Sequence, residues 1–104
     1  MNEASTLPIQ ITVSLEDGVV VCKPDPTVVS PGQTVVWNME PEVGNVSAVF
    51  QDRPFVERHP FPSRAVATVM GRNSVKKGET FHTHFKNNVT GQEMKTRGDI
   101  IIGG

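Results

Sequence analysis

The amino-acid sequence predicts an all-β fold: a Greek-key β-sandwich or barrel of seven to eight short strands. Apolar and polar residues alternate at period two in several segments, and no stretch shows the sustained period of an amphipathic helix. Eight prolines and nine glycines divide the 104 residues into short elements. This length suits one domain, residues 1–104, with a modest core. We expect residues 1–8 to form a flexible N-terminal segment.

The first half of the chain contains four predicted strands. IQITVSL alternates strictly, and the turn signal EDG separates it from VVVC. The prolines of KPDP end that second strand, because proline cannot donate to a central ladder. TVV follows, and the tight turn SPGQ leads into TVVWNM, which places Val35, Trp37 and Met39 on one face. The predicted ranges are 9–15, 19–22, 27–29 and 34–39.

The second half contains four more predicted strands between longer polar segments. NVSAVF resumes the β pattern after the break EPEVG. QDRPFVERHPFPSR has three prolines and no clean period, which predicts a long surface loop at 51–64. We also expect a polar loop at 86–98, KNNVTGQEMKTRG. The predicted strands are 45–50, 65–70, 79–85 and 99–102.

Charge and cysteine content exclude several classes of protein. The net charge of −1 gives no basic field for nucleic acid. No apolar run approaches the roughly 20 residues that cross a bilayer, so we expect no membrane insertion. The N-terminus lacks signal-peptide features, which favours the cytoplasm, or the periplasm or the exterior if an export signal has been trimmed. The lone Cys22 excludes an internal disulfide and a four-thiolate zinc site, and we expect it to be a buried packing residue.

The order of motifs resembles the cupredoxin family, the fold of the small blue copper proteins. The resemblance covers about Val19 to Ile102 and rests on VSPGQTVVWNM, NVSAVF, VKKGETFHTHF, a loop with a methionine and a closing DIII. It implies a copper site of two histidines, a cysteine and an axial methionine. In this chain those positions fall on Asn45 or Val46, Phe85, Asn88 and Met94.

Only Met94 matches a copper ligand, so the resemblance implies a cupredoxin-like fold without its blue-copper centre. A thioether alone is a poor ligand, and blue copper needs a thiolate with two imidazoles. We therefore expect no cofactor. The loops at the end that would hold copper, around Asn45 and Asn88, are candidates for an interaction surface.

Two histidines stand two positions apart in TFHTHF, which raises a second possibility. On a strand, Phe81, Thr83 and Phe85 share one face, and the phenylalanines must turn inward. His82 and His84 then project outward together, with Cβ atoms about 7 Å apart. The default interpretation is a solvated surface pair. The alternative is a metal site completed by a third ligand, for which His59 and Met94 are weak candidates.

The loop segment RPFVERHPFP, at 53–62, contains Phe55 and Phe61 among arginines and prolines. The aromatic rings either cap one edge of the sandwich or form a contact patch for another protein, since interfaces are enriched in aromatic residues and arginine.

Three functions follow from the sequence. The first is a copper-free binding or interaction module, whose partner is another protein. The second is a copper- or zinc-binding protein that uses the surface histidines for storage or delivery, not electron transfer. The third is an enzyme, which we do not expect because no catalytic constellation is recognisable.

Overall fold

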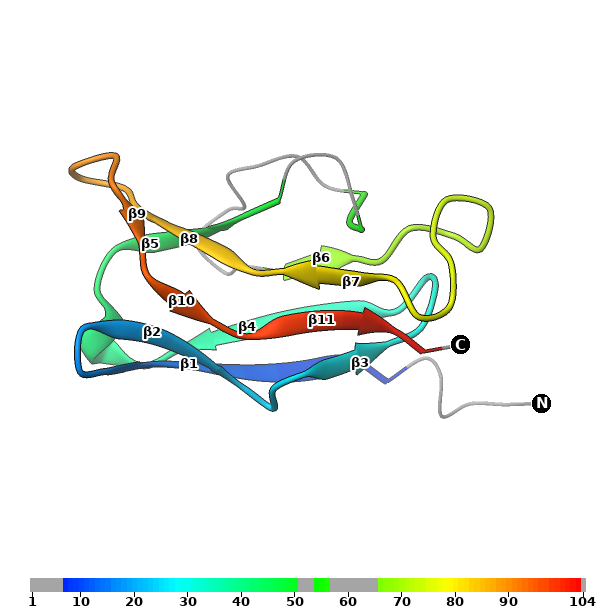
Figure 1. Ribbon diagram of the computed structural model, residues 1–104, viewed down its shortest axis with the longest axis horizontal. Helices are drawn as coiled ribbons and strands as arrows, with labels where there is room; N and C mark the ends of the chain where they lie inside the picture. Colours follow the sequence, from blue (N-terminus) through cyan, green and yellow to red (C-terminus); the bar gives the residue numbers. More distant parts are fainter. Residues whose placement is uncertain (1–6, 51–53, 57–65, 104) are drawn as a thin grey trace.

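The computed structural model describes residues 7–50, 54–56 and 66–103. These residues form an all-β structure of three sheets, two of them mixed and one antiparallel, around one core (Figure 1). The described residues contain no helix with the length and apolar character needed to cross a membrane. The three sheets confirm the prediction of an all-β fold.

The largest sheet has the strand order β10-β2-β1-β4-β6. The strands β1 and β2 form a hairpin whose turn, Asp17 and Gly18, has positive φ at both residues, 52° and 79°. Such a two-residue turn follows the right-handed twist of its strands. β4 then returns parallel to β1, with Ile11 opposite Trp37. The strands are β1 (Ile9–Glu16), β2 (Val19–Lys23), β4 (Thr34–Met39), β6 (Val66–Thr68) and β10 (Thr96–Arg97).

Two three-stranded sheets complete the structure, with orders β3-β11-β7 and β5-β8-β9. In β3-β11-β7, the central strand runs parallel to β3 and antiparallel to β7. A short 3₁₀ helix, Pro41–Val43, connects β4 to β5. The strands are β3 (Thr27–Val29), β5 (Val46–Val49), β7 (Thr80–His82), β8 (His84–Asn87), β9 (Glu93–Met94) and β11 (Asp99–Ile102).

The described residues thus form eleven strands, where the sequence predicts seven to eight. Part of the difference arises because two continuous segments each pass from one sheet to another. Figure 1 shows β7 running into β8 and β10 running into β11 as two long ribbons. The predicted loop 86–98 is wrong in part, because β8 extends into it and β9 and β10 lie within it. The sequence did not predict these strands because they lack the alternation of apolar and polar residues, and they form through backbone pairing.

The core lies between the sheets and is built by the inward faces of the strands. Phe50 and Phe55 contact Trp37 with ring centroids 6.0 and 5.2 Å away, and the two phenylalanines are 4.9 Å apart. Phe85 has no exposed surface, and Phe81 is half-buried against the same core. The predicted inward orientation of Phe81 and Phe85 is therefore confirmed, and Trp37, Phe50 and Phe55 form an aromatic cluster in the same core.

The N-terminal segment is only partly described. Residues 1–6 lie outside the described residues, and the carbonyl of Leu7 accepts a hydrogen bond of 3.1 Å from Nε2 of Gln33. Most of the predicted flexible segment, residues 1–8, thus lies outside the described residues, and Leu7 is bonded to a side chain 26 residues away in the sequence.

Candidate functional site

His82 and His84 occupy the junction between β7 and β8. Thr83 separates them, is only 1% exposed, and donates its backbone N–H to the carbonyl of Gly98 at 3.1 Å. The inward residue therefore attaches the junction to the segment between β10 and β11. Both imidazoles project to the surface, with side chains 48% and 49% exposed. The predicted outward orientation of the two histidines is confirmed.

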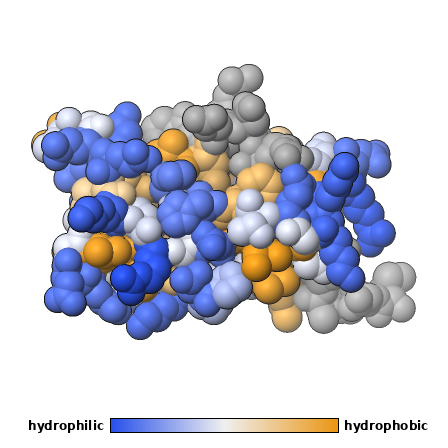
Figure 2. Space-filling view, in the orientation of Figure 1, coloured by the Kyte–Doolittle hydropathy of each residue, from blue (hydrophilic) through white to orange (hydrophobic). Residues whose placement is uncertain are grey.

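The two imidazole rings lie edge to face. Their centroids are 5.0 Å apart and the angle between their planes is 78°. The two rings are therefore direct neighbours on the surface. Figure 2 shows a mostly hydrophilic surface over the middle of the molecule, where β7 meets β8 in Figure 1.

Each imidazole is held by a carboxylate at the same ring nitrogen. Nδ1 of His82 lies 2.8 Å from Oδ1 of Asp99, and Nδ1 of His84 lies 3.1 Å from Oε2 of Glu93. Within the described part of the chain, Nε2 of neither ring makes a hydrogen bond. A carboxylate only accepts hydrogen bonds, so in the contact with Asp99 the proton lies on Nδ1 of His82, and in the neutral ring Nε2 then carries the lone pair. His84 and Glu93 form an ion-pair contact at the same ring nitrogen.

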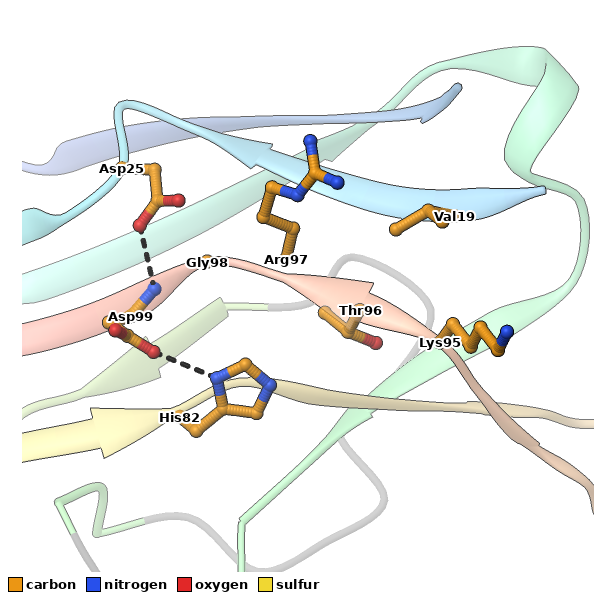
Figure 3. A pocket seen from close by; sticks show the side chains of 8 residues that line it. All are labelled: Val19, Asp25, His82, Lys95, Thr96, Arg97, Gly98 and Asp99. Atoms are coloured by element: carbon orange, nitrogen blue, oxygen red, sulfur yellow. Dashed lines mark hydrogen bonds and ion pairs between the residues drawn. The ribbon is translucent and has the colours of Figure 1, made fainter. Parts of the chain in front are cut away.

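Strand register places these carboxylates. Asp99 on β11 lies directly opposite His82 on β7. Glu93 on β9 lies opposite Lys86, two residues along β8 from His84. Asp99 is itself fixed, because its backbone N–H donates to Oδ1 of Asp25 at 3.1 Å. Figure 3 shows this chain of contacts from Asp25 through Asp99 to the ring of His82.

A carboxylate on Nδ1 is the arrangement that accompanies metal-binding histidines. The carboxylate fixes the tautomer and the ring orientation and makes the other nitrogen a better ligand. The described residues contain no group of three or more histidine, cysteine, aspartate or glutamate side chains that could hold a metal ion. The carboxylates therefore orient two exposed imidazole rings.

An open groove of about 510 Å³ adjoins His82 on the side of β10. It contains charges of both signs, because the two aspartates that support His82 lie across from two basic residues of the β10 segment (Figure 3). The groove is lined by Val19, Asp25, His82, Lys95, Thr96, Arg97, Gly98 and Asp99.

The positions to which the resemblance assigns copper ligands lie in or next to the strands β5, β8 and β9. Nδ2 of Asn88 donates to Oδ1 of Asn45 and to Oγ of Ser47, both at 2.9 Å. The backbone N–H of Asn88 also donates to the carbonyl of Asn45 at 2.9 Å. Phe85 lies opposite Met94. Asn88 is thus bonded to Asn45 through both its side chain and its backbone, and Phe85 is a fully buried core residue.

The thiol of Cys22 is a poor metal ligand, both for the histidine pair and for the positions around Asn45 and Asn88. Its side chain is buried in β2, and burial, with a smaller effect of the nearby Asp25 carboxylate, raises the pKa of the thiol to about 12. A neutral thiol is a weak ligand and a weak nucleophile. The predicted packing role of Cys22 agrees with this burial.

Several residues predicted from the sequence do not join the histidine pair. His59 and Phe61 lie outside the described residues. Met94 is half-buried against the core, opposite Phe85. Phe55 is only 1% exposed, which agrees with the alternative that its ring caps the core and removes Phe55 from the candidate interaction surface.

The sequence analysis missed the three carboxylates Asp25, Glu93 and Asp99. The period-two pattern determines which residues share a face of one strand, but not which residue of another strand lies opposite. Glu93 moreover falls in a segment without strand signals.

A scan against protein-family models finds none that matches the chain, and a search of the curated proteins finds no match either.

Proposed function

We propose that this protein is a cupredoxin-like Greek-key domain that lacks a blue-copper centre and binds a divalent transition-metal ion through Nε2 of His82 and His84. The observation that carries the metal proposal is that both exposed imidazoles have Nδ1 against a carboxylate, while Nε2 makes no hydrogen bond to any residue that the structure describes. Imidazole nitrogens suit zinc, copper and nickel.

The cupredoxin-like part of the proposal is supported by strand order. β1 lies parallel to β4 and β3 lies parallel to β11, so neighbours in space are distant in the chain. Long connections that bring strands distant in the chain side by side are a feature that this arrangement shares with Greek-key sandwiches, although these two pairs are parallel. Two pairs of the positions mapped by the resemblance are also neighbours, Asn45 with Asn88 and Phe85 with Met94.

Storage or delivery of the ion suits this site better than electron transfer. Blue-copper electron transfer depends on a thiolate ligand, and Cys22 is buried with a neutral thiol. Both imidazoles are about half exposed, so an ion bound there exchanges readily with a partner's ligands. We assign no enzyme activity and no organic cofactor to the chain.

An interaction module for another protein is the second candidate function. The groove beside His82 favours it, because Lys95 and Arg97 line one side while Asp25 and Asp99 line the other. A surface with both signs of charge selects partners by electrostatic complementarity.

Titration of the untagged protein with Zn(II) or Cu(II) against a chromophoric chelator tests the metal proposal. His82→Ala and His84→Ala should each remove most of the affinity, because each removes one of the two nitrogens. Asp99→Asn should raise Kd about 10–100-fold, the usual effect of losing a carboxylate behind a ligand histidine. Its backbone bond to Asp25 remains possible, which limits damage to the fold.

Glu42→Gln is the matched control for Asp99→Asn. It removes one exposed carboxylate from the 3₁₀ helix, away from both histidines in the chain, and should leave Kd unchanged. Equal affinity of wild type and the His82→Ala, His84→Ala double variant would eliminate the metal proposal and leave the interaction module.

A further inference from the structure

We propose that the ligand set at His82 and His84 is completed by a second copy of this chain, so that one zinc ion joins two molecules through four imidazoles. This inference rests on the proposed function, and it adds the partner and the stoichiometry. It begins from the number of ligands: zinc is almost always four-coordinate and tetrahedral in structural sites. The part of the chain described by the structure offers two imidazoles and no further ligand cluster.

The pair is placed where a second molecule can reach it. His82 belongs to β7, the edge strand of the sheet β3-β11-β7, and both imidazoles are about half exposed. Most homodimers have two-fold symmetry, in which the same patch of each molecule faces the other. A two-fold axis through the ion would supply two imidazoles from each side and fill a tetrahedral sphere.

Charge makes the ion necessary for this contact. Asp99 and Glu93 lie behind the rings, so two facing sites would bring four carboxylates together. A divalent cation at the centre offsets half of that charge. Lys86, which lies opposite Glu93 across β8 and β9, offsets part of the remainder in each copy. Without metal, the facing carboxylates oppose the association, and we therefore expect the apoprotein to be a monomer at this surface.

Sedimentation velocity and native mass spectrometry of the untagged protein test the inference, with the protein concentration varied and Zn(II) as the probe. We expect the mass to double on addition of one zinc ion per two chains and to return to that of the monomer with a chelator. His82→Ala and His84→Ala should each abolish the dimer. Lys86→Glu should weaken the dimer, because it replaces a compensating cation with a further anion, and Lys77→Glu, outside the paired strands, serves as the control.

The outcomes separate this inference from the proposed function. One zinc ion bound per monomer, lost in the histidine variants, would overturn the dimer and leave the metal site. A monomeric site that also requires His59 would overturn the dimer, since the third ligand would then come from the same chain. A dimer that persists without zinc or in the double variant would overturn it as well. Absence of any zinc binding would overturn both proposals.

Discussion

The imidazole of His82 stands edge-on to that of His84, with ring centroids 5.0 Å apart. The two residues belong to different sheets, and the buried Thr83 between them is the point at which the chain passes from one sheet to the other. The relative position of the rings is therefore set by the junction of two sheets. This makes the pair a preorganised site, because two elements of the core fix its geometry.

The double variant His82→Ala, His84→Ala should keep the stability of the wild type in the absence of metal. Both side chains are exposed to solvent, where substitutions usually change the free energy of unfolding by less than about 0.5 kcal/mol. Added Zn(II) should stabilise only the wild type, by about 2.7 kcal/mol at a hundredfold excess over Kd. Thermal melts with zinc and with chelator measure both effects. A similar zinc-dependent rise of Tm in the double variant would contradict the assignment of the ligands.

Reconstitution with Cu(II) should give no intense blue colour. The strong charge-transfer band requires a thiolate on the metal, and Phe85 occupies the position that the cupredoxin resemblance gives to that ligand. The visible absorption spectrum of the copper-loaded protein measures this, with the Cys22→Ala variant as the control. A blue band that disappears in Cys22→Ala would mean that the buried thiol does reach the metal.

Cys22 should be inert toward thiol reagents in the folded protein and reactive after denaturation. Its burial disfavours the thiolate, which raises the pKa from 9.0 to about 12. Below pH 9.0 the thiol is neutral in both folded and unfolded chains. Above it, the unfolded chain loses the proton first, so the contribution of Cys22 to stability declines between pH 9.0 and about 12.

A thiol-reactive dye, added with and without guanidinium chloride, checks the reactivity of Cys22. Denaturation at increasing alkaline pH, compared with Cys22→Ala, checks the linkage. Rapid labelling of the native protein at neutral pH would show that the β2 region opens often or that the thiol is accessible.

Phe85→Ala should lower the free energy of unfolding by about 3–5 kcal/mol, as for other buried aromatic residues. The side chain is fully buried in the core, between β5 and β9 on the same sheet. Val89→Ala is the control, since that side chain is 78% exposed and its truncation should have little effect. Chemical denaturation followed by the fluorescence of Trp37 measures both. Equal midpoints for the two variants would mean that the strand's inward and outward faces are reversed.

Gly98→Ala should destabilise the fold severely. Gly98 has φ of 150°, and a Cβ at this position would lie 2.7 Å from Cβ of Cys22. Both atoms belong to packed backbone positions and neither can move aside easily. Gly71→Ala is the control, because its φ is unstrained and a Cβ there meets no atom within 4 Å. The yield of folded protein and the denaturation midpoint distinguish the two. A Gly98→Ala variant as stable as Gly71→Ala would show that β10 and β2 are farther apart than described.

The alternation of residues predicts the face of each strand well, as the segment from Phe81 to Phe85 shows. Phenylalanine at both ends could only turn inward, and this placed Thr83 inside and the two histidines outside. The carboxylates behind the rings could not be predicted in this way. Asp99 contacts His82 although the two residues are 17 positions apart in the sequence. Their pairing depends on the register of β11, which lies between β3 and β7.

Phe55 illustrates a second limit of the sequence. It lies in a segment rich in proline and arginine without any strand period, where an exposed and a buried aromatic ring have the same local pattern. Its contacts with Trp37 and Phe50 arise because this short segment pairs with Val69 and turns the ring over the open end of the core. Such contacts depend on tertiary packing, which period and turn signals do not record.

The strand β11 is the last in chain order, yet it is the middle strand of the sheet β3-β11-β7. A ribosome delivers the chain from its N-terminal end, so β3 and β7 are synthesised before their shared partner exists. Until then each presents an unpaired strand edge to the other proteins of the cell. The β1–β2 hairpin closes as soon as it is synthesised, whereas this half of the sandwich assembles only after β11 has left the exit tunnel. Nascent chains that stall before Asp99 therefore expose open edges, which makes them natural targets for chaperones and proteases.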